Sequence, residues 1–177
     1  MLEIKRVRQD EEDKIHYFYH CLIEKINTKG KEPKVFLGDQ ALSKEIRKGN
    51  IYVGISLNRI ISIMILEHAD SRSFHVKNFE MSSQNVSTLY AMGVDPDYSG
   101  HGVANQMISF AIEQSRINGS DILRLDVLKD NAKDLDVYQN LGFQPIGSAK
   151  IIKDEQILDC DILNVNFRDF EESLFMY

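Results

Sequence analysis

The chain has 177 residues and a net charge of −6, with 43% hydrophobic and 27% charged residues. This composition is typical of a folded globular protein and excludes a disordered chain, a collagen-like chain and a disulfide scaffold. Taking roughly 150 residues per domain, we expect one domain over residues 1–177. We also expect no nucleic-acid partner, because such binding depends on cationic side chains that neutralise phosphates.

Other features favour a cytoplasmic protein that is not associated with a membrane. Residues 1–6 lack a hydrophobic signal region. The most apolar run, residues 60–66, is much shorter than the roughly 20 residues that a membrane-spanning helix needs. Cys21 and Cys160 show no metal-ligand spacing and suit a reducing compartment as small buried side chains. We therefore expect no metal site.

Hydrophobic periodicity predicts helices and a hairpin in the first half of the chain. The elements are, in chain order, a strand at residues 3–7, helices at 11–27 and 39–48, and strands at 51–57 and 60–67. Asp10 offers an N-cap for the first helix, and Gly49 a C-terminal stop for the second. A turn at Asn58-Arg59 joins the two strands of the hairpin. The apolar stripe of the first helix consists of Ile15, Phe18, Leu22 and Ile26.

The second half alternates strands and helices. A long loop at residues 68–85 precedes a strand at 86–94, a helix at 101–117, a strand at 122–128, a helix at 132–141 and a strand pair at 143–152 and 157–167. The order β-α-α-β-β-β-α-β-α-β-β predicts an α/β fold. We expect a mixed, mostly antiparallel central sheet of about seven strands with helices on both faces.

One loop has the pattern of an anion site. Residues 94–104 follow a predicted strand and open a predicted helix, and Gly100 and Gly102 let the backbone approach a ligand. The amides of a helix's first turn and the helix dipole favour a negative charge. A diphosphate is therefore the natural ligand, although a plain turn before a helix would show the same pattern.

A second element downstream contains Asn131, Tyr138 and Gly142-Phe143. Together the two elements resemble the GNAT superfamily of acetyl-CoA-dependent N-acetyltransferases. Val94, Pro96 and residues 99–104 match its strand–V-x-P–loop–(Q/R)-x-x-G-x-(G/A)–helix element. The downstream residues match its N-x-x-A-x-x-L-Y-x-x-x-G-F element, and the order of helices and strands fits this fold over residues 1–167.

The resemblance implies acetyl-CoA as a co-substrate and a role for each matching residue. Main-chain groups of Met92, Gly93 and Val94 would pair with the pantetheine arm, and the pyrophosphate would lie against Ser99, Gly100, His101, Gly102, Val103 and Ala104. Asn131 would hydrogen-bond the pantetheine, and Tyr138 would protonate the departing thiolate, for which a phenol with a pKa of about 10 is a reasonable acid.

Some of these residues also have a simpler interpretation. Asn131 is a good helix N-cap, Tyr138 could clamp the last helix onto the sheet, and His101 could be a plain surface residue. The chain departs from the family pattern at three positions: Ser99 replaces Gln or Arg, Asp134 replaces Ala and Val137 replaces Leu.

The general base is not evident from the sequence. A protonated amine must lose a proton before it attacks a thioester, but the strand at residues 86–94 contains no acid. The candidates are Glu67, His68, His75, Glu80 and Asp126, and a water chain or a neutral amine would also serve.

Two histidines and an acid share one side of the first predicted helix. His16, His20 and Glu24 follow at i, i+4 and i+8, a spacing that permits metal binding. They lie away from the apolar stripe, so we interpret them as a solvated face that could border an acceptor cleft.

We expect an N-acetyltransferase that acts on a primary amine of a small molecule or of a peptide or protein, with a homodimer as the default oligomeric state. One alternative is a non-catalytic acyl-CoA-binding regulator of the same fold. The other is a dinucleotide-binding oxidoreductase, whose fingerprint requires a third glycine where Asn105 stands.

Overall fold

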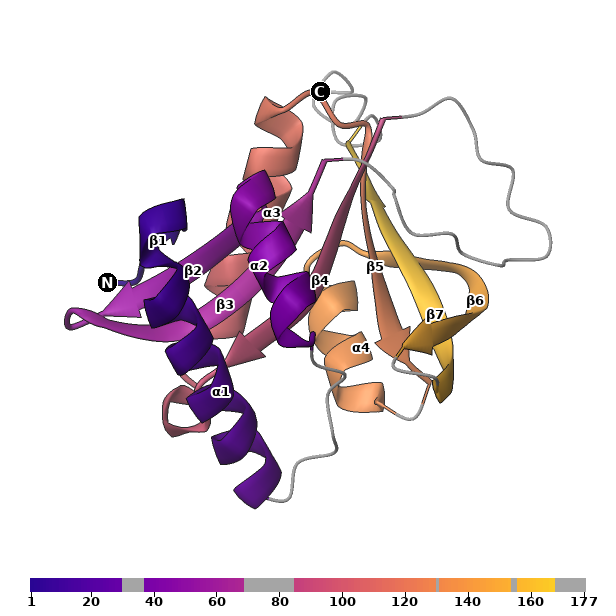
Figure 1. Ribbon diagram of the computed structural model, residues 1–177. Helices are drawn as coiled ribbons and strands as arrows, with labels where there is room; N and C mark the ends of the chain where they lie inside the picture. The colour runs from indigo at the N-terminus through magenta and orange to yellow at the C-terminus, as the bar shows by residue number, and fades with distance from the viewer. Residues whose placement is uncertain (30–36, 69–84, 130, 154–155, 168–177) are drawn as a thin grey trace. The chain divides into compact units, whose positions relative to one another are not determined.

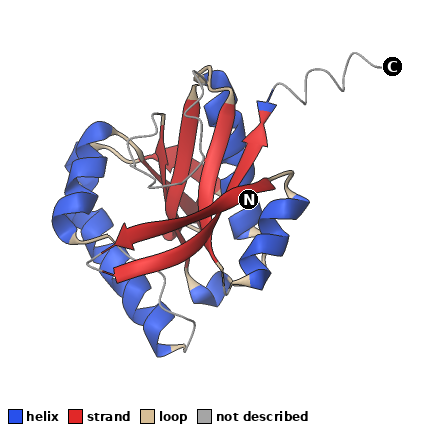
Figure 2. Ribbon diagram, turned by 90° about the vertical axis from the view of Figure 1, so that its right-hand side faces the viewer, coloured by secondary structure: helices blue, strands red, loops and turns tan. Residues whose placement is uncertain are grey.

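A computed structural model describes residues 1–29, 37–68, 85–129, 131–153 and 156–167. Over these residues the chain forms seven strands, four α-helices and two short 3-10 turns (Figure 2). In chain order the elements are β1 (Glu3–Arg6), η1 (Gln9–Glu11), α1 (Glu12–Thr28), α2 (Asp39–Lys48), β2 (Ile51–Ser56), β3 (Arg59–Glu67), β4 (Val86–Val94), η2 (Pro96–Tyr98), α3 (Val103–Ile117), β5 (Ile122–Leu128), α4 (Ala132–Asn140), β6 (Gln144–Lys153) and β7 (Gln156–Asn166).

The strands form a mixed sheet in the order β1-β2-β3-β4-β5-β7-β6. Neighbours β4 and β5 are parallel, whereas β1–β2, β2–β3, β5–β7 and β6–β7 are antiparallel. This confirms the predicted α/β class and the predicted order of elements.

The described chain gathers into two compact units. Unit 1 comprises residues 1–66 and 90–110, and unit 2 comprises residues 67–89 and 111–177 as far as the structure describes them. The strand β4 and the helix α3 each contribute residues to both units. The single domain expected over residues 1–177 stays a prediction.

In unit 1, α1 and α2 cover one face of the strands (Figure 1). Residues of β2 and β3 alternate between the two faces, as the pleat of a strand requires. Val53 and Ile63 join the core under α1 and α2. On the opposite face, the Tyr52 ring meets Phe110 of α3 edge to face at 5.3 Å. Helices on both faces of the strands are therefore present within this unit.

The helix α1 differs from its prediction in two details. Its buried side chains are Ile15, Tyr19, Leu22 and Ile26. The aromatic residue of the stripe is therefore Tyr19, whereas Phe18 packs at the margin. Asp10 is not the N-cap, because it lies within η1 and its carboxylate accepts hydrogen bonds from Arg8.

The starts of β3 and α3 differ from their predictions because residues before them have a left-handed backbone conformation. In the β2–β3 hairpin, Leu57 (φ 48°) and Asn58 (φ 60°) form the turn, so Arg59 already belongs to β3. Two consecutive residues with positive φ suit the twist of a tight hairpin. The helix α3 begins at Val103 rather than at residue 101, since Gly102 has φ 72° and cannot be helical.

Unit 2 is built around β5, β7 and β6. The strand β7 pairs with β5 on one side and with β6 on the other. The parallel pairing of β4 with β5 joins Val86–Thr88 to Ile122–Arg124. Phe143, which follows α4, is fully buried. Of the predicted loop at 68–85, residues 69–84 lie outside the described residues.

In the part of the chain that the structure describes, no helix is long and apolar enough to cross a membrane. Cys160 is buried and Cys21 half-buried, and within the described residues neither forms a disulfide.

Candidate functional site

The segment between β4 and α3, in unit 1, is a compact turn organised by Asp95. The Asp95 amide donates to the carbonyl of Ile61 at 2.8 Å, which anchors the end of β4 against β3. The Asp95 carboxylate then accepts a hydrogen bond from the Asp97 amide at 3.0 Å and caps η2. The turn therefore starts from a well-anchored residue.

The predicted anion-binding residues follow this turn. Gly100 and Gly102 have φ values of 81° and 72°, and a Cβ atom at either position would meet nothing within 4 Å. Both glycines are thus required by the backbone and not by packing. The Gln106 amide donates to the carbonyl of Gly102 at 3.1 Å. The amides of Val103 and Ala104 precede this bond, in the first turn where intrahelical acceptors are lacking.

These features fit a diphosphate. The first-turn amides and the positive end of the α3 dipole favour an anion, and the open space beside both glycines admits one. The His101 amide is less available, because it donates to the carbonyl of Tyr98 at 3.4 Å. The His101 ring Nδ1 lies 3.1 Å from the Ser99 carbonyl oxygen, and the side chain is exposed.

Two lysines of α1 hold the same turn. The Lys25 Nζ atom lies 2.7 Å from Asp95 Oδ2 and 3.0 Å from Asp97 Oδ2, and Lys29 Nζ lies 2.6 Å from Asp97 Oδ1. Hydrogen bonds from Lys29 and then Lys25 lower the pKa of Asp97 to about 2. The carboxylates of Asp95 and Asp97 raise the pKa of Lys25 in turn. The sequence pattern did not indicate these contacts, which join residues about 70 positions apart.

The end of β4 contains the expected pantetheine-binding residues Met92, Gly93 and Val94. Ala91, just before them, has φ 49°, a left-handed conformation that is unfavourable for a residue with a Cβ atom. Gly93 permits a close approach of α1, since a Cβ there would lie 2.9 Å from Leu22 Cδ2. Gly93 thus has a packing role that the family motif did not indicate.

In unit 2, Asn131 is the N-cap of α4. Its side-chain oxygen accepts a hydrogen bond from the Asp134 amide at 3.2 Å, and its Nδ2 donates to Asp134 Oδ2 at 2.6 Å. The capping interpretation is therefore confirmed. Asp134 stands where the family usually has alanine, and its carboxylate engages the side-chain NH2 group of Asn131.

Tyr138 lies on α4 and is partly buried. Its ring meets the buried ring of Phe143, which follows α4, at 5.8 Å with an interplanar angle of 69°, so Tyr138 also has a packing contact, and a clamp of α4 onto the sheet stays a prediction. Burial raises the pKa of the Tyr138 hydroxyl, and the carboxylates of Asp134 and Asp126 raise it further. The group therefore keeps its proton well beyond neutral pH.

The five candidate bases differ in their surroundings. Glu67 is buried, with 7% of its surface exposed. The His68 ring nitrogens lie 3.0 Å from Ser87 Oγ and 2.9 Å from Asn118 Nδ2, which builds it into a local hydrogen-bond network. Asp126 is partly exposed on β5, close enough to Tyr138 to affect its pKa. His75 and Glu80 lie outside the described residues.

The structure brings the two histidines of α1 to an acid that the spacing did not indicate. His16, His20 and Asp39 each place one donor atom within 4.8 Å of the other two. Asp39 is the first residue of α2, so only the packing of the two helices reveals it as the third member. Glu24, which shares the helical spacing of the two histidines, does not belong to this group.

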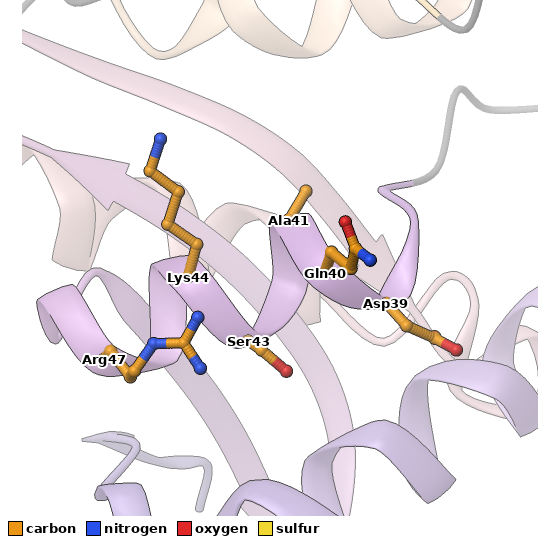
Figure 3. A pocket seen from close by; sticks show the side chains of 6 residues that line it. All are labelled: Asp39, Gln40, Ala41, Ser43, Lys44 and Arg47. Carbon is orange, nitrogen blue, oxygen red and sulfur yellow. The ribbon is translucent and has the colours of Figure 1, made fainter.

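A hollow of about 580 Å³ also lies along α2 (Figure 3). Its lining residues are Asp39, Gln40, Ala41, Ser43, Lys44 and Arg47, all from this one helix. It is open to solvent and contains none of the expected cofactor-binding residues.

Comparison with known proteins defines the class. Residues 31–143 match the acetyltransferase (GNAT) family, a stretch that includes the glycine turn, Asn131, Tyr138 and Phe143. The chain therefore belongs to the GNAT acetyltransferase family, and the sequence-based assignment is confirmed.

Among curated relatives, an uncharacterized N-acetyltransferase of Methanocaldococcus jannaschii is 32% identical over 69 residues, which is 39% of this chain and 30% of the relative. The ribosomal protein bS18-alanine N-acetyltransferase of Escherichia coli is 33% identical over 57 residues, which is 32% of this chain and 38% of the relative. The matches thus span about a third of the length of these relatives.

Solved structures show the same fold. An N-acetyltransferase from Staphylococcus aureus superposes with a TM-score of 0.74 and 18% identity, over 95% of this chain and 99% of that one. The NatC complex bound to Gag peptide and CoA gives a TM-score of 0.70 and 12% identity, over 93% and 98%.

Proposed function

We propose that this protein transfers the acetyl group of acetyl-CoA to a primary amine of a small molecule, peptide or protein. The observation that carries the proposal is the family match over residues 31–143, which contains both the glycine turn and the Asn131–Phe143 element. An oxidoreductase built on the glycines alone would leave the second element without a role.

The binding roles are proposed residue by residue. Gly100 and Gly102 shape the turn, and the first-turn amides of α3 at Val103 and Ala104 bind the pyrophosphate. The main chain of Met92–Val94 binds the pantetheine arm in the manner of an added strand. Ser99 lacks the long side chain usual in the family, and its amide donates to the carbonyl of Pro96 at 3.2 Å, so the phosphate contact there comes from its hydroxyl.

Asn131 has a combined role in this proposal. Its oxygen caps α4, and its NH2 group is held by Asp134, which fixes the orientation of the amide. A second proton of the same NH2 group can donate to a pantetheine carbonyl, since a primary amide nitrogen has two protons.

The chemical step is an aminolysis of the thioester. The amine nitrogen attacks the thioester carbonyl carbon, a C–N bond forms, the C–S bond breaks and the thiolate leaves. Tyr138 gives its hydroxyl proton to the thiolate. Its raised pKa keeps Tyr138 protonated before the thiolate forms, but it also makes the phenol a weaker acid toward the thiolate than an ordinary tyrosine. A thioester is electrophilic enough that no Lewis acid is required, so we propose a transfer that needs no metal.

Asp126 is our choice for the general base. Among the described candidates it combines partial exposure with proximity to Tyr138, whereas Glu67 is buried and His68 is built into a hydrogen-bond network. A carboxylate near the acid, directly or through a water molecule, would accept the ammonium proton.

The acceptor class follows from the relatives only in general terms. The relatives include a ribosomal protein bS18-alanine N-acetyltransferase and a mycothiol acetyltransferase. We therefore propose that the acceptor has a primary amine, and the assay below includes both peptides and small molecules.

A thiol-release assay with acetyl-CoA tests the proposal. The acceptors should include amino acids, polyamines, amino sugars and peptides with free N-termini, and chelator should be present in one arm. We expect CoA release that requires an acceptor and is unaffected by chelator. Binding of CoA without turnover of any acceptor would indicate a non-catalytic acyl-CoA-binding regulator instead.

A further inference from the structure

We propose that His16, His20 and Asp39 form a binding site for one divalent transition-metal ion of the zinc class, which links α1 to α2. The proposal is independent of the acetyl transfer and uses none of the residues assigned to it. All three residues belong to unit 1.

The distances suit a metal ion. The His20 Nε2 atom lies 2.8 Å from Asp39 Oδ1, and His16 Nδ1 lies 3.6 Å from the same oxygen. Tetrahedral zinc with bonds of about 2.0–2.1 Å separates its ligand atoms by about 3.3 Å. These two separations bracket this value, and all three ligand atoms lie within 4.8 Å of one another, so small rotations of the exposed His20 and Asp39 side chains would complete the geometry.

The two histidines are suitably arranged on their helix. A spacing of i and i+4 brings two imidazoles onto one face, which is the spacing that helical zinc sites use. The rings are roughly stacked, with centroids 6.5 Å apart. The side chains of His20 and Asp39 are 60% and 65% exposed, so an ion can reach them from solvent.

Ser43 orients His16, one of the three proposed ligands. Its hydroxyl lies 2.9 Å from His16 Nε2, which directs the other ring nitrogen, Nδ1, toward Asp39. A hydrogen bond to the non-coordinating nitrogen is the usual way in which a metal-binding histidine is held. Figure 3 shows Asp39 and Ser43 pointing to a different side of α2 from Ala41 and Lys44, consistent with their contacts to α1.

The donor set selects the ion. Two imidazoles and one carboxylate suit zinc, nickel, cobalt and copper, whereas magnesium and calcium prefer oxygen ligands. Three protein ligands leave the fourth tetrahedral position to water. Glu12 lies 3.7 Å from His16 Nε2, on the nitrogen that faces Ser43, so it is not the fourth ligand.

The consequence is a metal-dependent connection between two helices. Because the ion binds the folded arrangement and not the unfolded chain, it stabilises unit 1 by mass action. With free zinc at about 100 times Kd, the melting temperature should rise by about 5–10 °C.

The test is calorimetric titration of the untagged full chain with zinc chloride, beside melting curves. We expect one ion per chain, a rise in melting temperature with zinc and none with magnesium, and intense visible absorption of the cobalt adduct that indicates tetrahedral coordination. His20→Ala and Asp39→Ala should each weaken zinc binding by at least about tenfold. Both side chains are exposed, so these variants should fold.

Two controls and one further variant make the result specific. His101→Ala removes a surface histidine outside the group, and Cys21→Ser removes the thiol next to His20; both should bind zinc like the unmodified chain. Ser43→Ala should weaken binding by about tenfold through loss of ring orientation. Undiminished binding in the His20→Ala/Asp39→Ala double variant, or no binding by the unmodified chain, would overturn the proposal.

Discussion

The Tyr138 hydroxyl lies in surroundings that oppose its ionisation. Burial and the neighbouring Asp134 and Asp126 carboxylates both disfavour a phenolate, so the pKa rises. The same ring packs against Phe143. The sequence motif indicated the position of this residue but not its electrostatic setting, because Asp126 is close to it only in the folded chain.

Tyr138→Phe retains the ring and removes the hydroxyl, so we expect turnover to fall by at least about tenfold with acetyl-CoA affinity nearly unchanged. Packing against Phe143 should survive. Steady-state kinetics and a direct binding measurement check this. Full turnover in the variant would assign Tyr138 a packing role only.

The pH dependence gives a second test of Tyr138. A raised pKa keeps the acid protonated to higher pH, so the phenol should remain competent up to its ordinary pKa of about 10 and beyond. Below about pH 9, the rates of the unmodified enzyme and of Tyr138→Phe should therefore depend on pH in the same way. The unmodified enzyme should show no additional loss of rate on the alkaline side. Such a loss would mean that the hydroxyl ionises early.

Gly102→Ala should separate backbone strain from ligand binding. A left-handed φ of 72° disfavours alanine by about 1 kcal/mol, which lowers the melting temperature by about 2–4 °C. We expect CoA affinity to fall by at least about tenfold, because the turn shifts and the first amides of α3 move with it. Melting curves and CoA titration check both values.

Gly38→Ala is the matched control. Gly38 also has open space around it, but its φ is −70°, so alanine fits without strain. Gly38 is the N-cap of α2, where alanine is less favourable than glycine, so we expect a loss of stability of about 0.5 kcal/mol and unchanged CoA affinity. Equal losses in both variants would contradict the assignment of the effect to the glycine turn.

At the scale of elements, α1 is joined to the β4–α3 turn through charged side chains. Asp95 is nearly buried, with 12% of its side chain exposed, whereas its partner Lys25 is 43% exposed. Hydrophobic periodicity predicted the existence, type and approximate bounds of these elements. It could not give their contacts, because the pairs of Lys25 and Lys29 with Asp95 and Asp97 are far apart in the chain.

Lys25→Met should lower stability more than Lys29→Met. Lys25→Met leaves the nearly buried Asp95 carboxylate without this ammonium group. After allowance for solvent screening, the free energy of unfolding should fall by about 1–2 kcal/mol, which lowers the melting temperature by about 3–6 °C. Lys29 contacts the exposed Asp97, so its loss should change little. Equal melting temperatures for the two variants would contradict this ranking.

The ion pairs of Asp97 also make the stability of the protein depend on pH in the acid range. The pKa of Asp97 is lowered to about 2, so the contribution of this carboxylate is present above its ordinary value of 3.8 and is lost as the pH falls toward 2. The melting temperature of the unmodified chain should therefore fall between about pH 4 and pH 2. Asp97→Asn should show a smaller fall over this range, and an equal fall would show that other carboxylates cause it.

At the scale of the whole molecule, the sequence sufficed for the family and for the order of the strands and helices. Two motifs and a run of alternating patterns indicated both, and the match over residues 31–143 and the sheet order confirm them. The details that differ from the prediction, at Asp10, Phe18 and the hairpin turn, depend on local backbone geometry. Many different sequences share such geometry, so the sequence pattern does not determine it. The group of His16, His20 and Asp39 was not predictable, because Asp39 meets the histidines only through the packing of α2 on α1.

Acetyl-CoA and CoA should raise the melting temperature of the full chain, and NAD should not. A ligand that binds only the native state stabilises it by about 2.7 kcal/mol at 100 times Kd, or about 5–10 °C here. Thermal shift measurements with the three ligands check this. A larger shift with NAD would favour the dinucleotide-binding alternative.

The most direct test follows the acetyl group itself. The chain is incubated with acetyl-CoA labelled in the acetyl carbonyl and with a panel of primary amines, and the products are analysed by mass spectrometry. Acetyl transfer to an amine predicts the label in an amide of at least one amine, formed together with free CoA and at least about tenfold more slowly by Tyr138→Phe. Binding of acetyl-CoA without label in any amine, across small molecules and peptides, would contradict it.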